Sequence, residues 1–358
     1  MREINSLCKD IINLGDSNSQ EINSVAFISL KRALQSYFST YKSISLFGRT
    51  VLKDCSKEDF TRIPNRDYIE QYSETIVHFQ HFFELVCKDI LRKEHELLVL
   101  RIDNKHDVLY RLLQQENVAP SELEGIKTID VGVAIDRLCT LIKENFLDTT
   151  YSFFAEVNNS HALKALNRLR NEIWHKGSFV MQYNSLDLFV GGYILPLVEK
   201  IINTPAYFEN IPFWKYHKLS LEIDPISEII QECNLNTPSI EKIAFLKELG
   251  RAAYNNPLPK NHSAFRNRVV GRAINSASYE LFQPYELKDF VEKCPVCGVD
   301  SLVKYIHTET YEDNNGRNYN YSYVEYIKCQ CCNFELHDGG MENLLKFGYE
   351  LPNYWSVF

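Results

Sequence analysis

The chain has 358 residues and a formal net charge of −8, with 45% hydrophobic and 24% charged residues. These values are typical of a globular protein and allow two or three domains. The acidic balance excludes broad electrostatic coating of nucleic acid, although it allows a local basic groove. Because the sequence has no run of about 18 apolar residues, we expect no transmembrane helix and no membrane partner.

Ten cysteines divide into two groups. Five are scattered, and three of these lie in apolar helical patterns where cysteine acts as a small core residue: Cys8, Cys55, Cys87, Cys139 and Cys233. The other five lie between residues 294 and 332. A cluster of this kind indicates a metal site in a reducing compartment rather than a disulfide framework. Residues 1–5 also lack the apolar core of a signal peptide, so we expect a cytoplasmic protein.

Helical patterns fill the first part of the chain. Residues 1–60 predict an N-terminal helical extension, and further helices are expected at 68–98, 103–115 and 131–146. His78 and His81 lie three residues apart in the long helix. No third metal ligand is apparent near them in the pattern, so they predict packing or surface roles.

The next predicted helix, at residues 160–176, carries the most reactive pattern in the chain. Arg170, Asn171 and His175 lie there within six positions. A histidine with a pKa near ~6.5 can transfer protons at neutral pH, and an arginine can hold a phosphate and offset its developing charge. The same residues also suit an ordinary helix end, because Arg and His oppose the negative end of the macrodipole and Gly177 can act as a C-cap.

The pattern Arg170-Asn171-x-x-x-His175, near the end of a helix in an all-helical segment, resembles the R-N-x-x-x-H motif of HEPN-domain proteins. The resemblance implies an HEPN-like helical domain over residues 61–205. It also implies a metal-independent endoribonuclease in which these three residues are catalytic and RNA is the substrate. Phage defence or a toxin–antitoxin system is the implied setting, with an antitoxin or defence-system protein as a partner. One HEPN toxin subgroup has a tyrosine where this chain has Gly177, so control by modification of that tyrosine is not expected.

Helical geometry separates the two key side chains of the motif. Asn171 and His175 share one polar stripe, whereas Arg170 lies roughly 140° from His175 around the helix. Three arrangements would bring them together: the helix ends before His175, the long Arg170 side chain reaches around the helix, or a second protomer completes the pair. HEPN nucleases dimerise with their motifs facing each other, so the resemblance favours the third arrangement, a homodimer.

Two apolar features accompany this expectation. Residues 186–202 are apolar nearly all round, so we expect them to be buried in a bundle or at a dimer interface. Trp174 lies four residues after Arg170 and could stack on it, although a core or interface position is the more common role of tryptophan.

After residue 205, prolines mark a boundary, and residues 206–290 predict a helical connector. Its clearest helix start is Thr237-Pro238, with Thr237 as the N-cap and Pro238 as the first helical residue. Three arginines cluster later in the connector and form either a small basic patch or an ordinary solvated helix face: Arg266, Arg268 and Arg272.

Two cysteine pairs with matching C-x2-C spacing lie in the last segment, residues 291–358, which we assign to a zinc ribbon and a C-terminal tail. Cys294 and Cys297 form the first pair, and Cys329 and Cys332 form the second. Four thiolates at two such knuckles suit one tetrahedral Zn²⁺ ion. They leave no open position for water, so the sequence predicts a structural zinc rather than a catalytic one.

The sequence between the pairs predicts a β-hairpin, with strands at 302–310 and 319–328 and a turn at Asn314-Asn315-Gly316. This order of knuckle, hairpin and knuckle resembles a zinc ribbon. Cys331 could replace Cys332 as a ligand, although Cys332 gives the standard spacing. Three alternating tyrosines line one face of the hairpin, where they either stack on bases or pack on a neighbouring domain: Tyr319, Tyr321 and Tyr323.

The sequence therefore predicts a mainly α protein. Its parts are an HEPN-like helical bundle, helical extensions and a small C-terminal β-hairpin zinc ribbon. The expected function is that of a metal-independent endoribonuclease. The alternative is a non-catalytic HEPN and zinc-ribbon module that binds nucleotides, RNA or protein.

Overall fold

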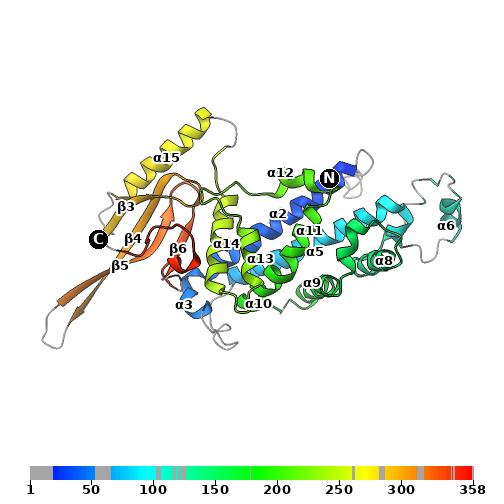
Figure 1. The fold of residues 1–358 in the computed structure, drawn as a ribbon, viewed down its shortest axis with the longest axis horizontal. Coiled ribbons are helices and arrows are strands. Elements are labelled where there is room, and N and C mark those ends of the chain that lie inside the picture. Colours follow the sequence, from blue (N-terminus) through cyan, green and yellow to red (C-terminus); the bar gives the residue numbers. More distant parts are fainter. Residues whose placement is uncertain are drawn as a thin grey trace, which may run out of the picture. The chain divides into compact units, whose positions relative to one another are not determined.

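The protein is described by a computed structural model that covers residues 19–52, 66–101, 106–114, 116, 118–119, 122, 126–177, 179–259, 263–281, 287–312, 318–339, 341 and 343–356. It is 63% helical and 12% strand, which confirms the predicted mainly α class with a small antiparallel sheet at the C-terminus (Figure 1). Among the described helices, none combines the length and the apolar character needed to cross a membrane.

Packing divides the chain into two compact units, each assembled from separate stretches of sequence. The first unit comprises Met1–Ala33, Ile76–Phe179 and Leu197–Trp214, and the second comprises Leu34–Thr75, Val180–Pro196 and Lys215–Phe358. Helices α2 (Ser19–Ile44) and α5 (Arg66–Glu94) contribute residues to both units. The division of the sequence at residues 60, 205 and 290 stays a prediction.

Helices predicted from apolar spacing form the first unit. Besides parts of α2 and α5, its elements are η3 (Glu96–Val99), β1 (Leu100–Arg101), α6 (His106–Leu113), β2 (Lys127–Thr128), α8 (Val131–Lys143), η4 (Thr149–Ala155), α9 (Val157–Lys176), η6 (Phe208–Asn210) and α12 (Ile211–Trp214). Short strands β1 and β2 pair antiparallel. His81 Nδ1 lies 2.8 Å from Ser29 Oγ, so this half-buried histidine makes a polar contact with α2.

The second unit contains most of the remaining helices. They are η2 (Ser45–Phe47), α3 (Gly48–Val51), α10 (Tyr183–Phe189), the π-helical turn η5 (Val190–Ile194), α13 (Pro225–Cys233), α14 (Ile240–Tyr254), α15 (Ser263–Leu281) and η7 (Leu344–Phe347), while α11 (Leu195–Ile202) crosses from this unit into the first. Helix α14 begins later than predicted. Its N-cap is Ser239, whose Oγ accepts from Lys242 N at 3.2 Å, so the assignment of this role to Thr237 was wrong.

The predicted helix at 186–202 is interrupted by η5. At Gly191 an added Cβ would lie only 2.4 Å from Cys233 Sγ and 2.9 Å from Ile229 Cγ2, so glycine allows close packing of η5 on α13. Most apolar side chains of the segment are buried within the chain, and Leu188 and Tyr193 are the exposed exceptions. The expected burial is therefore confirmed without a partner molecule, and this segment gives little support to a dimer interface.

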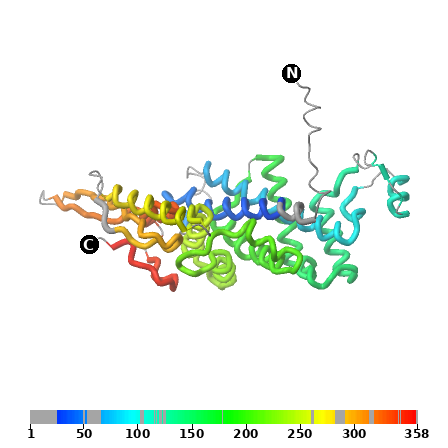
Figure 2. Tube along the Cα trace, turned by 90° about the horizontal axis from the view of Figure 1, so that it is seen from above, coloured from blue at the N-terminus to red at the C-terminus, as the bar shows by residue number. Residues whose placement is uncertain are grey.

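Four antiparallel strands form the C-terminal sheet in the order β3-β4-β5-β6. Their bounds are Leu287–Lys293, Asp300–Glu312, Asn318–Cys329 and Glu335–His337. The hairpin of β4 and β5 confirms the two predicted strands, whereas β3 and β6 were not predicted; the turn at Asn314-Asn315-Gly316 lies outside the described residues. Helix α15 packs Ala277 against Val303 and Tyr305, and it runs along the strands in both views (Figures 1 and 2).

Candidate functional site

Helix α9 of the first unit carries all three predicted catalytic residues. The helix stays regular to Lys176 and ends at Gly177, whose φ of 63° is left-handed and whose N–H donates to Ile173 O at 3.1 Å. Glycine adopts this conformation without a steric penalty, so the C-cap role of Gly177 is confirmed. The helix therefore does not end before His175, and the first of the three arrangements does not occur.

The side chain of Arg170 is directed along the helix to Trp174. Arg170 Nη1 donates to Asn171 Oδ1 at 3.0 Å, and the guanidinium carbon lies 5.6 Å from the centre of the Trp174 ring. His175 is exposed, and within the described residues no hydrogen bond joins it to Arg170. A single chain thus brings Arg170 and Asn171 together but leaves His175 apart from Arg170, which also removes the second arrangement.

Apolar side chains at the C-terminal end of α9 are only partly buried by the rest of the chain. Leu163 and Leu166 are buried, whereas Ile173, two turns later, is only half-buried. Trp174 is 65% exposed and Phe179 is also exposed. A core position for Trp174 within the chain is therefore wrong, and its stacking on Arg170 is observed instead. Exposed aromatic rings beside Arg170 and Lys176 leave this end of the helix available for contact with another molecule.

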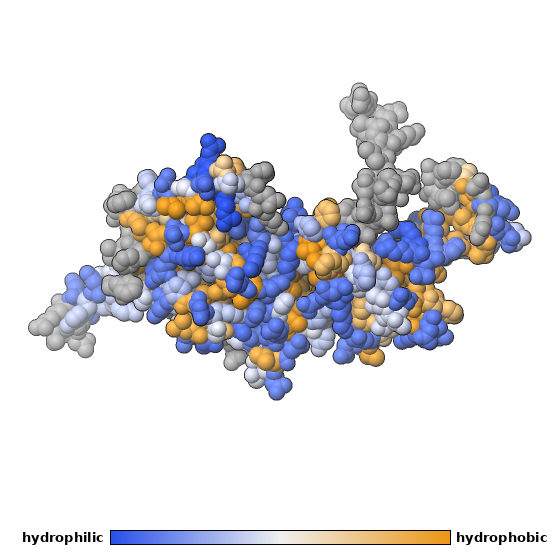
Figure 3. Space-filling model, turned by 45° about the horizontal axis from the view of Figure 1, so that its top comes forward, coloured by the Kyte–Doolittle hydropathy of each residue, from blue (hydrophilic) through white to orange (hydrophobic). Residues whose placement is uncertain are grey.

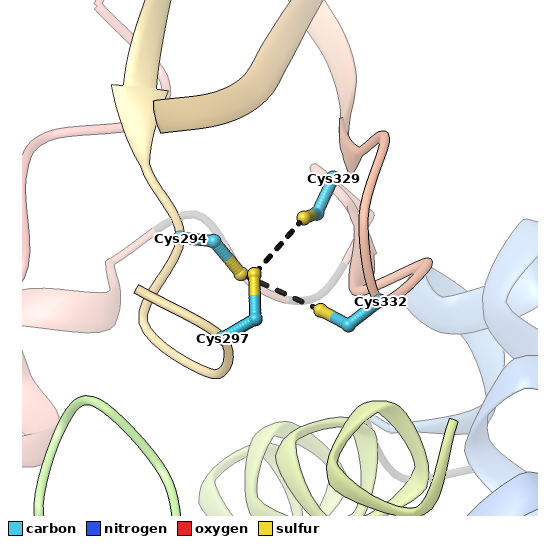
Figure 4. A group of neighbouring side chains, drawn as sticks. All are labelled: Cys294, Cys297, Cys329 and Cys332. Atoms are coloured by element: carbon cyan, nitrogen blue, oxygen red, sulfur yellow. Dashed lines mark hydrogen bonds between the residues drawn. The ribbon is translucent and has the colours of Figure 1, made fainter. Parts of the chain in front are cut away.

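In the second unit, the two cysteine pairs point their four thiols toward one centre (Figure 4). The cluster consists of Cys294, Cys297, Cys329 and Cys332. Cys294 Sγ lies 3.6 Å from Cys332 Sγ, and Cys297 Sγ lies 3.6 Å from Cys329 Sγ. All four sulfurs are within 4.8 Å of one another and all four residues are buried. A tetrahedral zinc with metal–sulfur bonds of ~2.3 Å has sulfurs about 3.8 Å apart. The cluster can therefore hold one metal ion, with a geometry compatible with zinc.

The backbone of the two knuckles follows one pattern. The N–H of Gly298 donates to Cys294 O at 3.0 Å, and the N–H of Asn333 donates to Cys329 O at 3.1 Å. Both donors have a left-handed φ, 74° at Gly298 and 59° at Asn333. Glycine and asparagine tolerate this conformation best, so the residue after each pair allows the tight turn that points two sulfurs at one centre.

Cys331 takes part in the second knuckle through its backbone. Its N–H donates to Cys329 Sγ at 3.3 Å, and Ser301 Oγ lies 3.3 Å from the same sulfur. Cys332, not Cys331, shares the four-thiol cluster. Donors around a metal-binding sulfur stabilise its negative charge and fix its position, so Cys331 and Ser301 support the site without adding a sulfur to it.

Hydrogen bonds connect the second knuckle to helix α14. Arg251 Nη2 donates to Asn333 O, and Glu248 Oε1 accepts from Glu335 N at 2.7 Å. Glu248 and Arg251 also form an ion pair of 2.6 Å. Burial raises the pKa of Glu248, and the charge of Arg251 opposes this rise. The knuckle is thus part of the helical core of the second unit rather than a separate appendage.

Two of the three hairpin tyrosines have largely exposed side chains. Tyr319 and Tyr321 are more than half exposed, and Tyr323 Oη donates to Glu309 Oε1 at 3.1 Å. About half or more of each of these two side chains is therefore not covered by other parts of the chain. Their stacking on bases stays a prediction.

A buried charge pair was missed from the sequence. Lys247 Nζ of α14 lies 2.6 Å from Asp187 Oδ1 of α10, and both side chains are 0% exposed. The ring centres of Tyr183 and Tyr37 lie 3.9 and 4.9 Å from the same nitrogen. Burial lowers the pKa of Lys247 to about 8, against the raising effect of Asp187. The sequence did contain a signal for this pair, because Asp187 lies inside an otherwise apolar segment and a buried aspartate needs a partner.

No protein-family model, no curated protein and no solved structure matches this chain. The resemblance to HEPN proteins rests on the motif of α9 and on the helices around it.

Proposed function

We propose that this protein is a metal-independent endoribonuclease of the HEPN type, acting in phage defence or in a toxin–antitoxin system. The observation that carries the proposal is the composition of the last two turns of α9. Arg170 and Asn171 are bonded to each other there, and an exposed His175 follows one turn later. These are a phosphate-binding group, a group that positions it, and a proton-transfer group.

The proposed reaction is an internal transesterification. The ribose 2′-oxygen attacks phosphorus and the bond to the 5′-oxygen breaks, which gives a 2′,3′-cyclic phosphate and a 5′-hydroxyl. His175 takes the proton from the 2′-hydroxyl or gives one to the leaving 5′-oxygen. Arg170 offsets the extra negative charge on the phosphate oxygens in the transition state, and Asn171 Oδ1 holds the guanidinium in place.

A homodimer supplies what a single chain lacks in this scheme. The reaction needs one group that accepts a proton and another that donates one. Each α9 offers a single His175, and its Arg170 is directed to Trp174 instead. Two facing motifs would provide both proton-transfer groups and place the arginine of one protomer near the histidine of the other. The exposed Trp174 is consistent with such an interface.

Zinc has a structural role in this proposal. The ion would be held by Cys294, Cys297, Cys329 and Cys332 and would cross-link the two knuckles. Four thiolates fill the coordination sphere, so the proposed RNA chemistry does not pass through it.

Cleavage of synthetic single-stranded RNA without divalent metal tests the proposal. His175→Ala and Arg170→Ala should each lower the cleavage rate by about 100-fold or more, because a positioned proton-transfer group and a charge-stabilising donor each contribute at least that factor. His161→Ala is the matched control, since His161 is also exposed on α9. It should cut at the wild-type rate.

The chelator needs its own control, because EDTA could also remove the structural ion. Zinc content is therefore measured in the same sample, and the cut ends are typed as cyclic phosphate or free phosphate. Cleavage that requires added magnesium, or a His175→Ala variant as fast as His161→Ala, would replace the nuclease proposal with a binding module. The separation of Arg170 from His175 in one chain favours that second candidate if the protein is monomeric.

A further inference from the structure

Helix α15 of the second unit has two chemically different faces. Its inner face buries Ala273 and Ala277, and Ala277 packs on the sheet. Its outer face carries Phe265 and Tyr279, which are 54% and 67% exposed. At 100° per residue, these two rings share one stripe within about 60° with two exposed arginines: Arg268 and Arg272.

The order along this stripe is aromatic, arginine, arginine, aromatic. At 1.5 Å per residue the stripe from Phe265 to Tyr279 is about 21 Å long. Figure 3 shows hydrophilic residues in blue beside hydrophobic residues in orange on this side of the sheet-containing end. An ordinary solvated helix face has charged groups without two large exposed rings, so the composition of this stripe indicates binding.

A basic cavity lies near the first turn of α15. It measures about 720 Å³ and extends along the first cysteine knuckle to the loop around Ser220. Three side chains with a permanent positive charge line it, together with one half-buried histidine and one carboxylate: Lys218, Arg266, Lys293, His217 and Glu222. The carboxylate is bonded to one of the cations, with Glu222 Oε1 3.1 Å from Lys218 Nζ.

Helix α15 itself carries more positive than negative side chains. Helix α15 contains three arginines and one carboxylate, Glu280, which accepts a hydrogen bond from Tyr305 Oη at 3.1 Å. Within the described residues, no salt bridge involves Arg266, Arg268 or Arg272. In a chain of net charge −8, this local excess of cations is a binding feature rather than a general property of the surface.

The chemistry of the stripe selects a single-stranded nucleic acid. Arginines bind backbone phosphates, and exposed aromatic rings stack on bases of any sequence. A duplex would hide the base faces that Phe265 and Tyr279 can cover. A peptide made of acidic residues alone would use the cations but would leave both rings uncovered.

We propose that the α15 stripe and the adjacent cavity bind single-stranded RNA without sequence specificity. Arg268 and Arg272 contact backbone phosphates along the stripe, and Arg266 and Lys293 hold a phosphate at the cavity. Phe265 and Tyr279 stack on bases. The choice of RNA rather than DNA rests on the proposed function, whereas the choice of a single strand rests on the side chains of α15.

Binding is measured by the fluorescence anisotropy of labelled oligouridylate on full-length His175→Ala protein, so that the probe is not cut. Phe265→Ala with Tyr279→Ala should weaken binding about 30-fold or more, because each of the two stacked bases contributes a factor of about 5 or more. Arg268→Ala with Arg272→Ala should reduce the slope of log affinity against log salt by about 1.4, since each phosphate contact on a single strand contributes ~0.7. An unlabelled duplex should compete poorly.

Matched controls come from the first unit, where Lys127, Lys143 and Phe146 are also exposed. Lys127→Ala with Lys143→Ala, and separately Phe146→Ala, should bind as the parent does. Circular dichroism checks that the variants are folded. No binding by the parent, equal binding of duplex and single strand, or equal losses in the controls would each overturn the inference.

The two proposals fail separately. If the parent binds oligouridylate through α15 but wild-type protein does not cut RNA, only the nuclease proposal is lost. If wild-type protein cuts RNA, and the α15 substitutions change neither binding in the His175→Ala protein nor cleavage in the protein that keeps His175, only the α15 site is lost.

Discussion

Asp187 and Lys247 place two opposite charges in the core of the second unit, with a nitrogen–oxygen distance of 2.6 Å and no solvent exposure. Such a pair contributes little net stability, because the cost of removing both charges from water offsets their attraction. Removing only one partner is different, since the other charge then stays buried and uncompensated. The two aromatic rings beside Lys247 add cation–π contacts that a shorter side chain would lose.

Lys247→Met should therefore lower the free energy of unfolding by about 3–5 kcal/mol, whereas Lys247→Met combined with Asp187→Leu should recover most of this loss. Denaturant unfolding of the three proteins measures both changes. The exposed pair Lys218 and Glu222 is the control, and Lys218→Met should change stability by less than about 1 kcal/mol. If the double variant is as unstable as Lys247→Met, the pair acts through shape and not through charge.

The same pair makes the free energy of unfolding depend on pH, and the sign of this dependence follows from the burial of Lys247. Burial lowers the pKa of Lys247 to about 8 in the folded protein, whereas an unfolded lysine has a pKa of ~10.4. Between these values the unfolded chain binds more protons, so the contribution of Lys247 to the free energy of unfolding rises with pH. Wild-type protein should thus gain stability relative to the double variant across this window.

At the scale of elements, the hairpin and the cysteine knuckles could be predicted because their signals are local. The fixed C-x2-C spacing predicts the knuckles, and two runs of β-forming residues predict the hairpin. Neither β3 nor β6 was predicted from the sequence. Strand β6 has only three residues and is defined by its pairing with β5, which a local pattern does not show. Likewise, apolar spacing detects the 186–202 segment but cannot show that Asp187 meets Lys247, 60 residues away. The direction of Arg170 toward Trp174 also depends on rotamers that spacing does not specify.

Loss of the metal site should affect more than the sheet, because the second knuckle is hydrogen-bonded to α14. We expect about one zinc per chain in the wild-type protein, and Cys294→Ser should abolish it and lower the unfolding temperature of the second unit. Elemental analysis and calorimetry measure the two effects. Cys331→Ser should keep the metal, since it retains the backbone N–H that contacts Cys329 Sγ. Wild-type protein purified without chelator but nearly free of zinc would rule out the site.

At the scale of the whole molecule, the expected assembly is a homodimer through the end of α9. Light scattering should give about twice the 41.8 kDa mass of the chain. Trp174→Asp should produce monomers and remove cleavage, because a charge would be placed in a contact formed by a ring that is 65% exposed in the single chain. Phe146→Asp, also at an exposed ring of the first unit, should stay dimeric. A monomer with full nuclease activity would contradict the shared site.

The assembly of the second unit from distant segments has a consequence for protein synthesis. Lys42 of α2 pairs with Glu335, 293 residues later, and Phe38 packs directly on Gly250. At ~5–20 residues per second, a ribosome needs about 15–60 s to make the chain between Lys42 and Glu335. For much of that time Phe38 has left the exit tunnel, but Gly250, on which it packs in the folded protein, has not yet been made. A nascent chain stalled before α14 therefore exposes the apolar side of α2 around Phe38, which chaperones would have to shield.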